Sequence, residues 1–271
     1  MYREFFGLKE KPFNITSDPN FLFLSRAHKE AFSHLLYGIK ERKGFLEITG
    51  EVGAGKTTLC RALLGQLDKK TKSAFIFNST LPELQLLQAI LEDFGIIVNR
   101  RNKVSLLKQL NAFLIDELTH GNNVVLIIDE AQNLKTSMLE EIRMLSNLET
   151  DKEKLFQIIL VGQPELKNKL ASPSLRQLRQ RISVRFHITP LQKDEIAGYI
   201  SHRLSVAGSS GQVVFEPDAV DRIFDFSGGI PRLINTVCDK SMLTAYVMET
   251  RQITMPMVER SIYEMEGHLV G

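Results

Sequence analysis

A glycine-rich segment that follows a short apolar run limits the folds this chain can adopt. Gly50 to Thr57 reads Gly-Glu-Val-Gly-Ala-Gly-Lys-Thr, which fits the phosphate-loop pattern of a glycine, any four residues and then Gly-Lys-Thr. Its glycines let backbone N–H groups turn inward around phosphate oxygens, and a helix N-terminus adds partial positive charge. The segment lies between an expected strand, 45–49, and an expected amphipathic helix, which is the context this motif requires.

We therefore expect this loop to bind the phosphates of ATP. Lys56 can reach the β and γ phosphates, and the Thr57 hydroxyl is a Mg²⁺ ligand. A chance match to the motif is the alternative, and the strand and helix around it weigh against that alternative. The residues expected at the nucleotide are Gly50, Glu51, Val52, Gly53, Ala54, Gly55, Lys56, Thr57 and Thr58.

A second apolar run ends in two acids. The run Val124 to Ile128 is followed by Asp129 and Glu130. Asp129 lies 73 residues after Lys56. An acid at the end of such a strand can hold Mg²⁺, and a neighbouring acid can polarise the attacking water. We assign Asp129 to the metal and Glu130 to the water. An acidic helix cap after a core strand is the competing interpretation, which the phosphate loop disfavours.

Short apolar runs alternate with amphipathic stretches along the first 189 residues. This pattern predicts an α/β fold with a parallel sheet covered by helices. Beyond Pro190 the patterning is only helical, so we expect a core at 1–189, including an N-terminal extension, and a small all-helical domain at 190–271. Ser25 and Ser137, the latter with Glu140, have the spacing of helix caps. Five strands are expected, at 45–49, 74–77, 124–128, 155–161 and 183–188.

The composition limits the class of protein and its expected location. Cys60 and Cys238 are the two cysteines, far apart and without metal-site spacing, so a disulfide scaffold and a zinc module are not expected. No apolar run approaches the ~18 residues that span a bilayer, so we expect no integral membrane segment and a cytoplasmic location. The net charge of +2 disfavours bulk coating of nucleic acid but allows a local basic patch.

The order of these motifs resembles the AAA+ ATPases, and more narrowly the general secretion pathway protein A family. Its short relatives include the ATPase of the mannose-sensitive haemagglutinin pilus and ATPases of exopolysaccharide export loci. The resemblance implies a three-layer AAA+ core with a helical lid. It covers nearly the whole chain and rests on Phe6-Gly7-Leu8, Lys11-Pro12-Phe13, Thr49 to Thr57, Asp129-Glu130-Ala131-Gln132, Gly162 to Leu166, and Arg176 to Ile182.

The resemblance also implies roles for residues outside the two motifs. Gln163 falls where a polar sensor of the γ-phosphate lies, and Arg232, after Gly228-Gly229, falls where the lid presents a second sensor. Arg181 falls where an arginine finger reaches a neighbouring subunit's nucleotide. Arg179 and Arg176 compete with it for that role. Each role has an alternative. Gln163 can be read as an ordinary turn residue, Arg232 as a surface arginine, and Arg176, Arg179 and Arg181 as part of a solvated basic face.

The implied function is Mg²⁺-dependent ATP hydrolysis that energises assembly of a bacterial secretion, pilus or polysaccharide-export system. The expected partners are further copies in a ring, hexamers included, and components of that system, one of which would hold the chain at the inner membrane. The basic, acid-free stretch between Leu166 and His187 motivates a rival, an ATP-gated DNA-binding regulator resembling transposition ATPases, although DNA is the less favoured partner. A switch that binds ATP without hydrolysing it is a third possibility. The aromatics between Phe13 and Phe23 suit either an adenine pocket or core packing.

Overall fold

The computed structural model describes residues 2–77, 79–99, 102–146 and 154–267. A five-stranded parallel sheet has the strand order β2-β3-β4-β1-β5. The predicted α/β class and the five strands are confirmed, with boundaries within three residues of those expected. The strands are β1 (Phe45–Gly50), β2 (Thr71–Ile76), β3 (Asn123–Ile128), β4 (Gln157–Gly162) and β5 (Ile182–Ile188).

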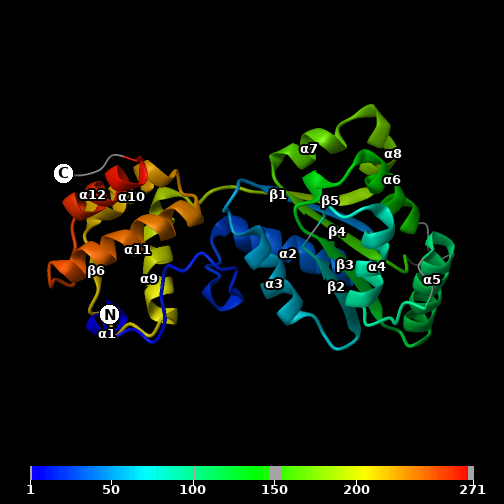
Figure 1. Cartoon of the computed structure of the whole chain (residues 1–271), viewed down its shortest axis with the longest axis horizontal. Coiled ribbons are helices and arrows are strands. Elements are labelled where there is room, and N and C mark those ends of the chain that lie inside the picture. Colours follow the sequence, from blue (N-terminus) through cyan, green and yellow to red (C-terminus); the bar gives the residue numbers. More distant parts are fainter. Residues whose placement is uncertain (1, 78, 100–101, 147–153, 268–271) are drawn as a thin grey trace. The chain divides into compact units, whose positions relative to one another are not determined.

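The central strands are buried, and apart from polar residues such as Glu47 and Thr49 they are apolar. All residues of β1 and β4 are buried, as are the five residues Val124 to Ile128 of β3. Such continuous apolar runs are typical of parallel strands between two layers of helices, and Figure 1 shows helices on both sides of the sheet. These helices are α2 (Arg26–Lys40), α3 (Lys56–Gln66), α4 (Glu83–Asp93), α5 (Lys103–Thr119), α6 (Thr136–Leu145), α7 (Pro164–Leu170) and α8 (Arg176–Arg181).

The chain forms two compact units. The sheet unit comprises residues 29–50 and 59–188, and the helical unit comprises the described residues of 1–28, 51–58 and 189–271. The phosphate loop therefore belongs by its contacts to the helical unit, although the chain leaves β1 to enter it and continues into α3. The functional division into a core at 1–189 and a lid at 190–271 stays a prediction.

The helical unit has its own core, which unites both ends of the chain. Phe6, Phe13 and Phe21 are buried in it together with residues of the C-terminal helices. Core packing therefore accounts for Phe13 and Phe21. The elements are α1 (Tyr2–Phe5), α9 (Ile196–Val206), α10 (Pro217–Ser227), α11 (Pro231–Val247), α12 (Met255–Met265) and the 3-10 turns η1 (Pro19–Phe21) and η4 (Lys193–Glu195).

Two local expectations are corrected. The C-terminal region is not purely helical, because β6 (Val214–Phe215) pairs in parallel with β7 (Gln252–Ile253). Each of these strands has two residues, too few for an alternation of apolar and polar positions to show. Ser137 does not cap α6, which begins at Thr136 after Lys135 and has no side-chain cap. Ser25 does cap α2, since its Oγ accepts a hydrogen bond of 3.2 Å from the N–H of His28.

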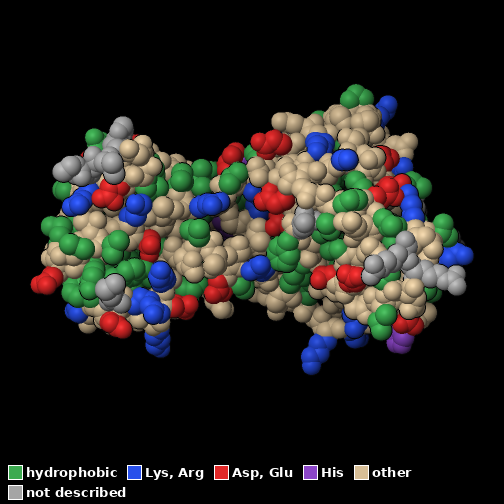
Figure 2. All heavy atoms as spheres, in the orientation of Figure 1, with side chains coloured by type: hydrophobic (Ala, Val, Ile, Leu, Met, Phe, Trp, Pro, Cys, Tyr) green, Lys and Arg blue, Asp and Glu red, His purple; other side chains and the backbone are tan. Residues whose placement is uncertain are grey.

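No helix among the described residues is long and apolar enough to cross a membrane. On the face in Figure 2, acidic and basic side chains are interspersed over both units. This mixture agrees with the net charge of +2.

Candidate functional site

The phosphate loop begins where β1 ends. Gly50, the last residue of β1, pairs with Ile188 of β5, and a Cβ at Gly50 would lie 2.8 Å from the Ile188 carbonyl oxygen. Only glycine allows the two strands to approach this closely at the point where the loop starts. The loop ends at Lys56, the first residue of α3, so Lys56 and Thr57 lie in the first helical turn. The free N–H groups of that turn and the helix dipole favour an anion there.

Two glycines inside the loop adopt the left-handed backbone conformation. Gly53 has φ +79° and Gly55 has φ +88°, values that side-chain-bearing residues rarely adopt. A Cβ on Gly53 would lie 2.5 Å from the Cβ of Arg232, and one on Gly55 would lie 3.0 Å from Nε2 of His28. Both glycines are therefore required by the backbone and by the neighbours that close on the loop.

Lys56 is buried, with 5% of its surface exposed. Its Nζ donates a hydrogen bond of 2.9 Å to the carbonyl oxygen of Glu51, across the loop. Burial of an ammonium group is costly unless hydrogen-bond acceptors or anions surround it. The loop backbone thus surrounds the Lys56 ammonium, and a bound phosphate would supply it with further oxygen acceptors. Of the remaining loop residues, Ala54 is buried, Gly53, Gly55, Thr57 and Thr58 are half-buried, and Glu51 and Val52 are exposed.

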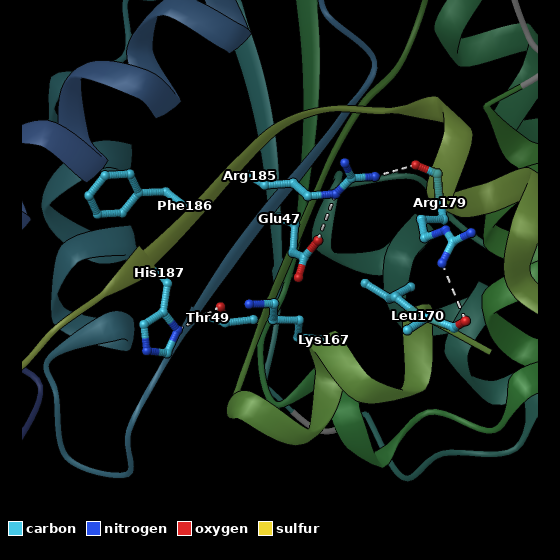
Figure 3. A pocket seen from close by; sticks show the side chains of 9 residues that line it. Glu47, Thr49, Lys167, Leu170, Arg179, Arg185, Phe186 and His187 are labelled. Atoms are coloured by element: carbon cyan, nitrogen blue, oxygen red, sulfur yellow. Dashed lines mark hydrogen bonds and ion pairs between the residues drawn. The ribbon is translucent and has the colours of Figure 1, made fainter.

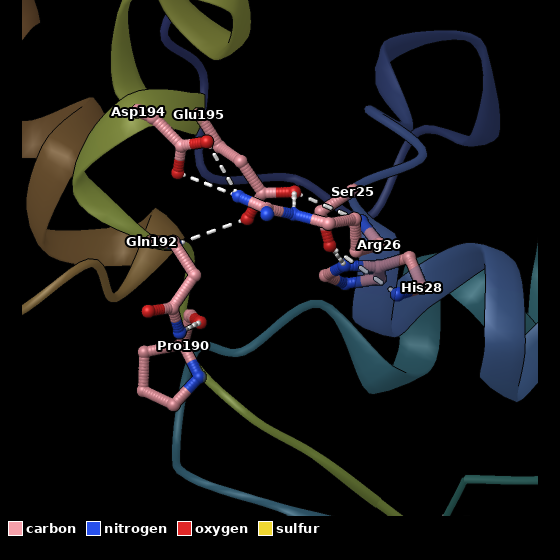
Figure 4. Close-up of polar contacts among 7 residues, drawn as sticks. All are labelled: Ser25, Arg26, His28, Pro190, Gln192, Asp194 and Glu195. Atoms are coloured by element: carbon pink, nitrogen blue, oxygen red, sulfur yellow. Dashed lines mark hydrogen bonds and ion pairs between the residues drawn. The ribbon is translucent and has the colours of Figure 1, made fainter.

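His28 supports the loop from the N-terminal segment. Its Nε2 lies 3.0 Å from the carbonyl oxygen of Ala54, and its Nδ1 lies 2.7 Å from Oγ of Ser25 (Figure 4). Burial lowers the pKa of His28 and outweighs the hydrogen bond to Ala54, which raises it. The ring is therefore neutral near pH 7, and the bond to Ala54 identifies Nε2 as the protonated nitrogen. The sequence did not predict this contact, since 26 residues separate the partners and no motif includes a histidine there.

Arg26 fastens the same segment to the start of the C-terminal region. Its guanidinium lies 2.6 Å from both carboxylate oxygens of Asp194, and its N–H donates a bond of 2.9 Å to Glu195 (Figure 4). Burial raises the pKa of Glu195, but hydrogen bonds from the N–H groups of Arg26 and Gln192 outweigh it, and the pKa is lowered. Ser25 to His28 is thus held at one end by η4 and at the other by the phosphate loop.

Arg232 lies against the loop, at the beginning of α11. Its N–H donates a bond of 3.3 Å to the carbonyl oxygen of Gly53. Gly228 and Gly229 precede it, both with positive φ, and Pro231 occupies the first helical position as predicted. The structure therefore brings Arg232 and the phosphate loop together within the helical unit.

In the sheet unit, the acids follow β3 directly. Asp129 is buried, and its Oδ1 accepts a bond of 2.9 Å from the N–H of Glu130. Glu130 has a left-handed backbone, with φ +51°, which is unusual for a residue other than glycine and turns the chain sharply after β3. Ser79 supports this turn by donating a hydrogen bond of 2.7 Å to the carbonyl oxygen of Glu130.

Gln163 joins Glu130 at the carboxyl edge of the sheet. It follows β4, the neighbour of β3, and its Nε2 donates a bond of 3.0 Å to Oε2 of Glu130. Gln132 donates to the same oxygen at 2.5 Å, and its own Oε1 accepts a bond of 3.1 Å from the N–H of Gln163. The carboxylate of Glu130 is therefore held by two amides. The structure brings Glu130 and Gln163 together, a contact that no sequence pattern predicted, and it adds Gln132, which the motif Asp129 to Gln132 includes.

The three candidate finger arginines lie in different surroundings. Arg181 is half-buried, and its Nη1 donates a bond of 3.0 Å to Oγ of Ser146. Arg179 and Arg176 are exposed, and Arg179 donates a long bond of 3.4 Å to the carbonyl oxygen of Ala171. Of the three, Arg181 is engaged with a side chain of its own unit.

The donor groups suit magnesium. Among the described residues no three His, Cys, Asp or Glu side chains gather as a metal site. The oxygen donors expected from the sequence are the Asp129 carboxylate and the Thr57 hydroxyl. Mg²⁺ is commonly held by one or two protein oxygens, substrate phosphates and water, so each of these oxygens is of a kind that the ion accepts.

Comparison with known proteins agrees with this geometry. A family model described as an AAA domain matches residues 39–170. General secretion pathway protein A of Aeromonas hydrophila is 43% identical over 268 residues, which is 98% of this chain and 49% of that protein. The chain therefore spans about half the length of this curated relative.

Solved structures show the same fold at low identity. The ORC2 protein of Aeropyrum pernix, in its ADPNP–ADP complexes, has a TM-score of 0.72 at 18% identity, covering 94% of this chain and 72% of that one. The Aeropyrum pernix ORC1 protein in complex with DNA has a TM-score of 0.62 at 16% identity, covering 89% and 66%. The matched AAA domain supports ATPase activity, the solved structures show the fold, and the resemblance predicted from the sequence is confirmed. Residues 39–170 match an AAA domain, and the chain is similar over 98% of its length to general secretion pathway protein A.

Proposed function

We propose that this chain binds ATP with Mg²⁺ and hydrolyses it. The observation that carries the proposal is the phosphate loop, in which a buried Lys56 stands at the N-terminus of α3 behind two glycines of positive φ. This arrangement presents backbone N–H groups and one ammonium to a polyphosphate.

The motif position and the local geometry of each residue support the role proposed for it. Lys56 and the loop N–H groups would bind the β and γ phosphates, and Thr57 and Asp129 would hold Mg²⁺, which neutralises phosphate charge when bound. Glu130 would accept the proton of the attacking water. Gln163 and Gln132 direct its carboxylate through Oε2, and Gln163 would also sense the γ-phosphate.

Two arginine roles complete the proposed cycle. Arg232, placed against Gly53, would reach the nucleotide phosphates and link their state to residues 190–271 acting as a lid. One arginine of α8 would act on the nucleotide of a neighbouring copy in a ring. Arg181 is the family's expected finger, and its bond to Ser146 would have to be exchanged for the phosphate.

We assign the chain to a bacterial secretion, pilus or polysaccharide-export system, in which hydrolysis would energise assembly. The 43% identity to general secretion pathway protein A supports this assignment. Under this proposal the chain works in the cytoplasm, and a partner of the envelope system brings it to the inner membrane.

The test is a titration of ATP and Mg²⁺ into the wild-type protein and Lys56→Ala. Removing a charge-assisted contact to phosphate should weaken binding by about 10- to 100-fold. Lys72→Ala, which removes an exposed lysine of β2, is the matched control and should bind as wild type. Equal affinity in all three proteins would contradict a phosphate-loop site.

The basic stretch of the sheet unit supports a second candidate, ATP-gated DNA binding. Lys167, Arg176, Arg179 and Arg185 are all exposed, and a solved protein of the same fold was captured with DNA. The interspersed charges in Figure 2 favour it less. Stimulation of ATP turnover by duplex DNA that vanishes as salt is raised would support this candidate; turnover indifferent to DNA would remove it.

A further inference from the structure

A cavity of about 410 Å³ lies within the sheet unit, and none of its lining residues belongs to the phosphate loop. Its lining comes from β1, β5 and the segment of α7 and α8 (Figure 3). The volume falls at the lower end of the range of small-molecule sites, roughly 300–1,000 Å³. The residues that carry the argument below are Glu47, Thr49, Lys167, Arg179, Arg185 and His187.

The register of β1 and β5 places polar side chains in pairs on one face of the sheet. Glu47 is paired with Arg185 and Thr49 with His187, and residues two apart on a strand share a face. Nε of Arg185 lies 3.3 Å from Oε2 of Glu47, and Oγ1 of Thr49 lies 3.0 Å from Nδ1 of His187. Figure 3 shows both pairs. The pairing of β1 with β5 thus places the Arg185 guanidinium and the His187 imidazole at the cavity.

Cations outnumber anions around this space. Lys167, Arg179 and Arg185 face a single carboxylate, Glu47, which is buried and already paired with Arg185. The Lys167 side chain makes no hydrogen bond or ion pair with the part of the chain that the structure describes, although its charge acts on the Glu47 carboxylate. Among the described residues, the Arg179 side chain donates one hydrogen bond, of 3.4 Å, to the carbonyl oxygen of Ala171. Burial raises the pKa of Glu47, and this effect outweighs Arg185 and Lys167, which lower it. The negative charge of Glu47 is therefore disfavoured.

The Arg185 guanidinium is also held in place. The Arg185 side chain bridges Glu47 and the carbonyl oxygen of Arg179, which ties β5 to α8. Two guanidinium groups present forked N–H donors that match phosphate oxygens, and the ammonium adds a mobile point charge. Leu170 and Ala171 provide an apolar wall beside them.

We propose that this cavity is a second anion site, which binds a small phosphorylated molecule independently of the phosphate loop. The size of the cavity and its single apolar wall fit a phosphate group with a short organic part. Because Thr49 directly precedes Gly50, an occupant would touch the strand that carries the phosphate loop.

The test uses inorganic pyrophosphate in the Lys56→Ala background, which disables the phosphate loop. Calorimetric titration should still find one saturable site. Adding Lys167→Ala or Arg179→Ala should weaken that site by about 10-fold or more, because each removes a charge-assisted contact. Arg176→Ala is the matched control, since Arg176 is exposed on the same helix and does not line the cavity. Circular dichroism of each variant verifies that the fold is kept.

Four results would overturn the proposal. Loss of all binding in Lys56→Ala alone would place pyrophosphate at the phosphate loop. Equal weakening by Arg176→Ala would reduce the effect to general surface charge. Succinate binding as tightly as pyrophosphate, or duplex DNA displacing it at lower concentration, would show that phosphorylated small molecules are not the class recognised.

Discussion

Nε2 of His28 lies 3.0 Å from the carbonyl oxygen of Ala54, so a histidine near the N-terminus holds a peptide of the phosphate loop. In a trans peptide the C=O and the next N–H point in opposite directions. Fixing the Ala54 carbonyl therefore also fixes the N–H of Gly55. That N–H is one of the groups expected to face phosphate.

His28→Ala should weaken ATP binding by about 2- to 10-fold, the effect of losing one hydrogen bond that orients a ligand group. His28→Gln should recover part of the affinity, because its amide N–H can donate to the same carbonyl. His34→Ala, an exposed histidine on the same helix, serves as the control in the same ATP titration. Unchanged affinity in His28→Ala would mean that the loop does not depend on this contact.

His28 also makes stability depend on pH. Its folded-state pKa lies below the ordinary 6.5, so between those values the unfolded chain binds more protons than the folded protein. The free energy of unfolding should therefore fall as pH drops from 7 through 6.5 toward the lowered pKa. Burial lowers the pKa of His202 in the same direction, so the informative quantity is the difference between proteins. Urea titrations at several pH values should show that the free energy of unfolding falls less in His28→Gln than in the wild type as pH drops. Parallel curves of this free energy against pH would contradict the prediction.

Gly53 and Gly65 should respond oppositely to alanine. At Gly53 the new Cβ would meet Arg232 at 2.5 Å with φ at +79°, and the left-handed backbone alone costs about 1–2 kcal/mol. At Gly65, inside α3, nothing lies within 4 Å, so alanine should stabilise by about 0.5–1 kcal/mol through helix propensity. Thermal unfolding of both variants measures this, and Gly53→Ala should also bind ATP more weakly. Equal stabilities would contradict the close approach of Arg232.

Gln163→Ala should separate turnover from binding. The amide holds the Glu130 carboxylate, so its loss should slow ATP hydrolysis by about 10-fold or more while the affinity for ATP stays close to wild type. Gln85→Ala, an exposed glutamine of α4, is the control for steady-state turnover. A variant that turns over at the wild-type rate would leave Gln163 without a role at Glu130.

Local patterns predicted the strands and the two motifs because these depend on consecutive residues. The apolar run Val124 to Ile128 can only be a buried strand or a buried helix segment, and its length favours a strand. Contacts between distant segments could not be predicted in this way. The pairing of Glu47 with Arg185 depends on β5 lying next to β1, and the support of Ala54 by His28 depends on the path of the N-terminal segment.

The N-terminal aromatics show the same limit. Aromatic residues such as Phe13 and Phe21 occur both in binding pockets and in hydrophobic cores. The contacts with the C-terminal helices identify these two as core residues. Ser137 and Glu140 have capping-box spacing, yet the helix starts at Thr136, two residues earlier than a cap at Ser137 would place its start. A spacing rule ranks alternatives, and tertiary packing selects among them.

The central claim, that Glu130 activates water for hydrolysis of ATP bound at the phosphate loop, is tested most directly by single-turnover hydrolysis with Glu130→Gln. The wild-type protein should convert bound ATP to ADP. The variant should bind ATP with similar affinity and convert it at least about 100-fold more slowly, since general-base catalysis contributes about 10²- to 10⁴-fold. Equal rates in the two proteins would remove Glu130 from catalysis, and a wild-type protein that binds ATP without cleaving it would instead be a nucleotide-dependent switch.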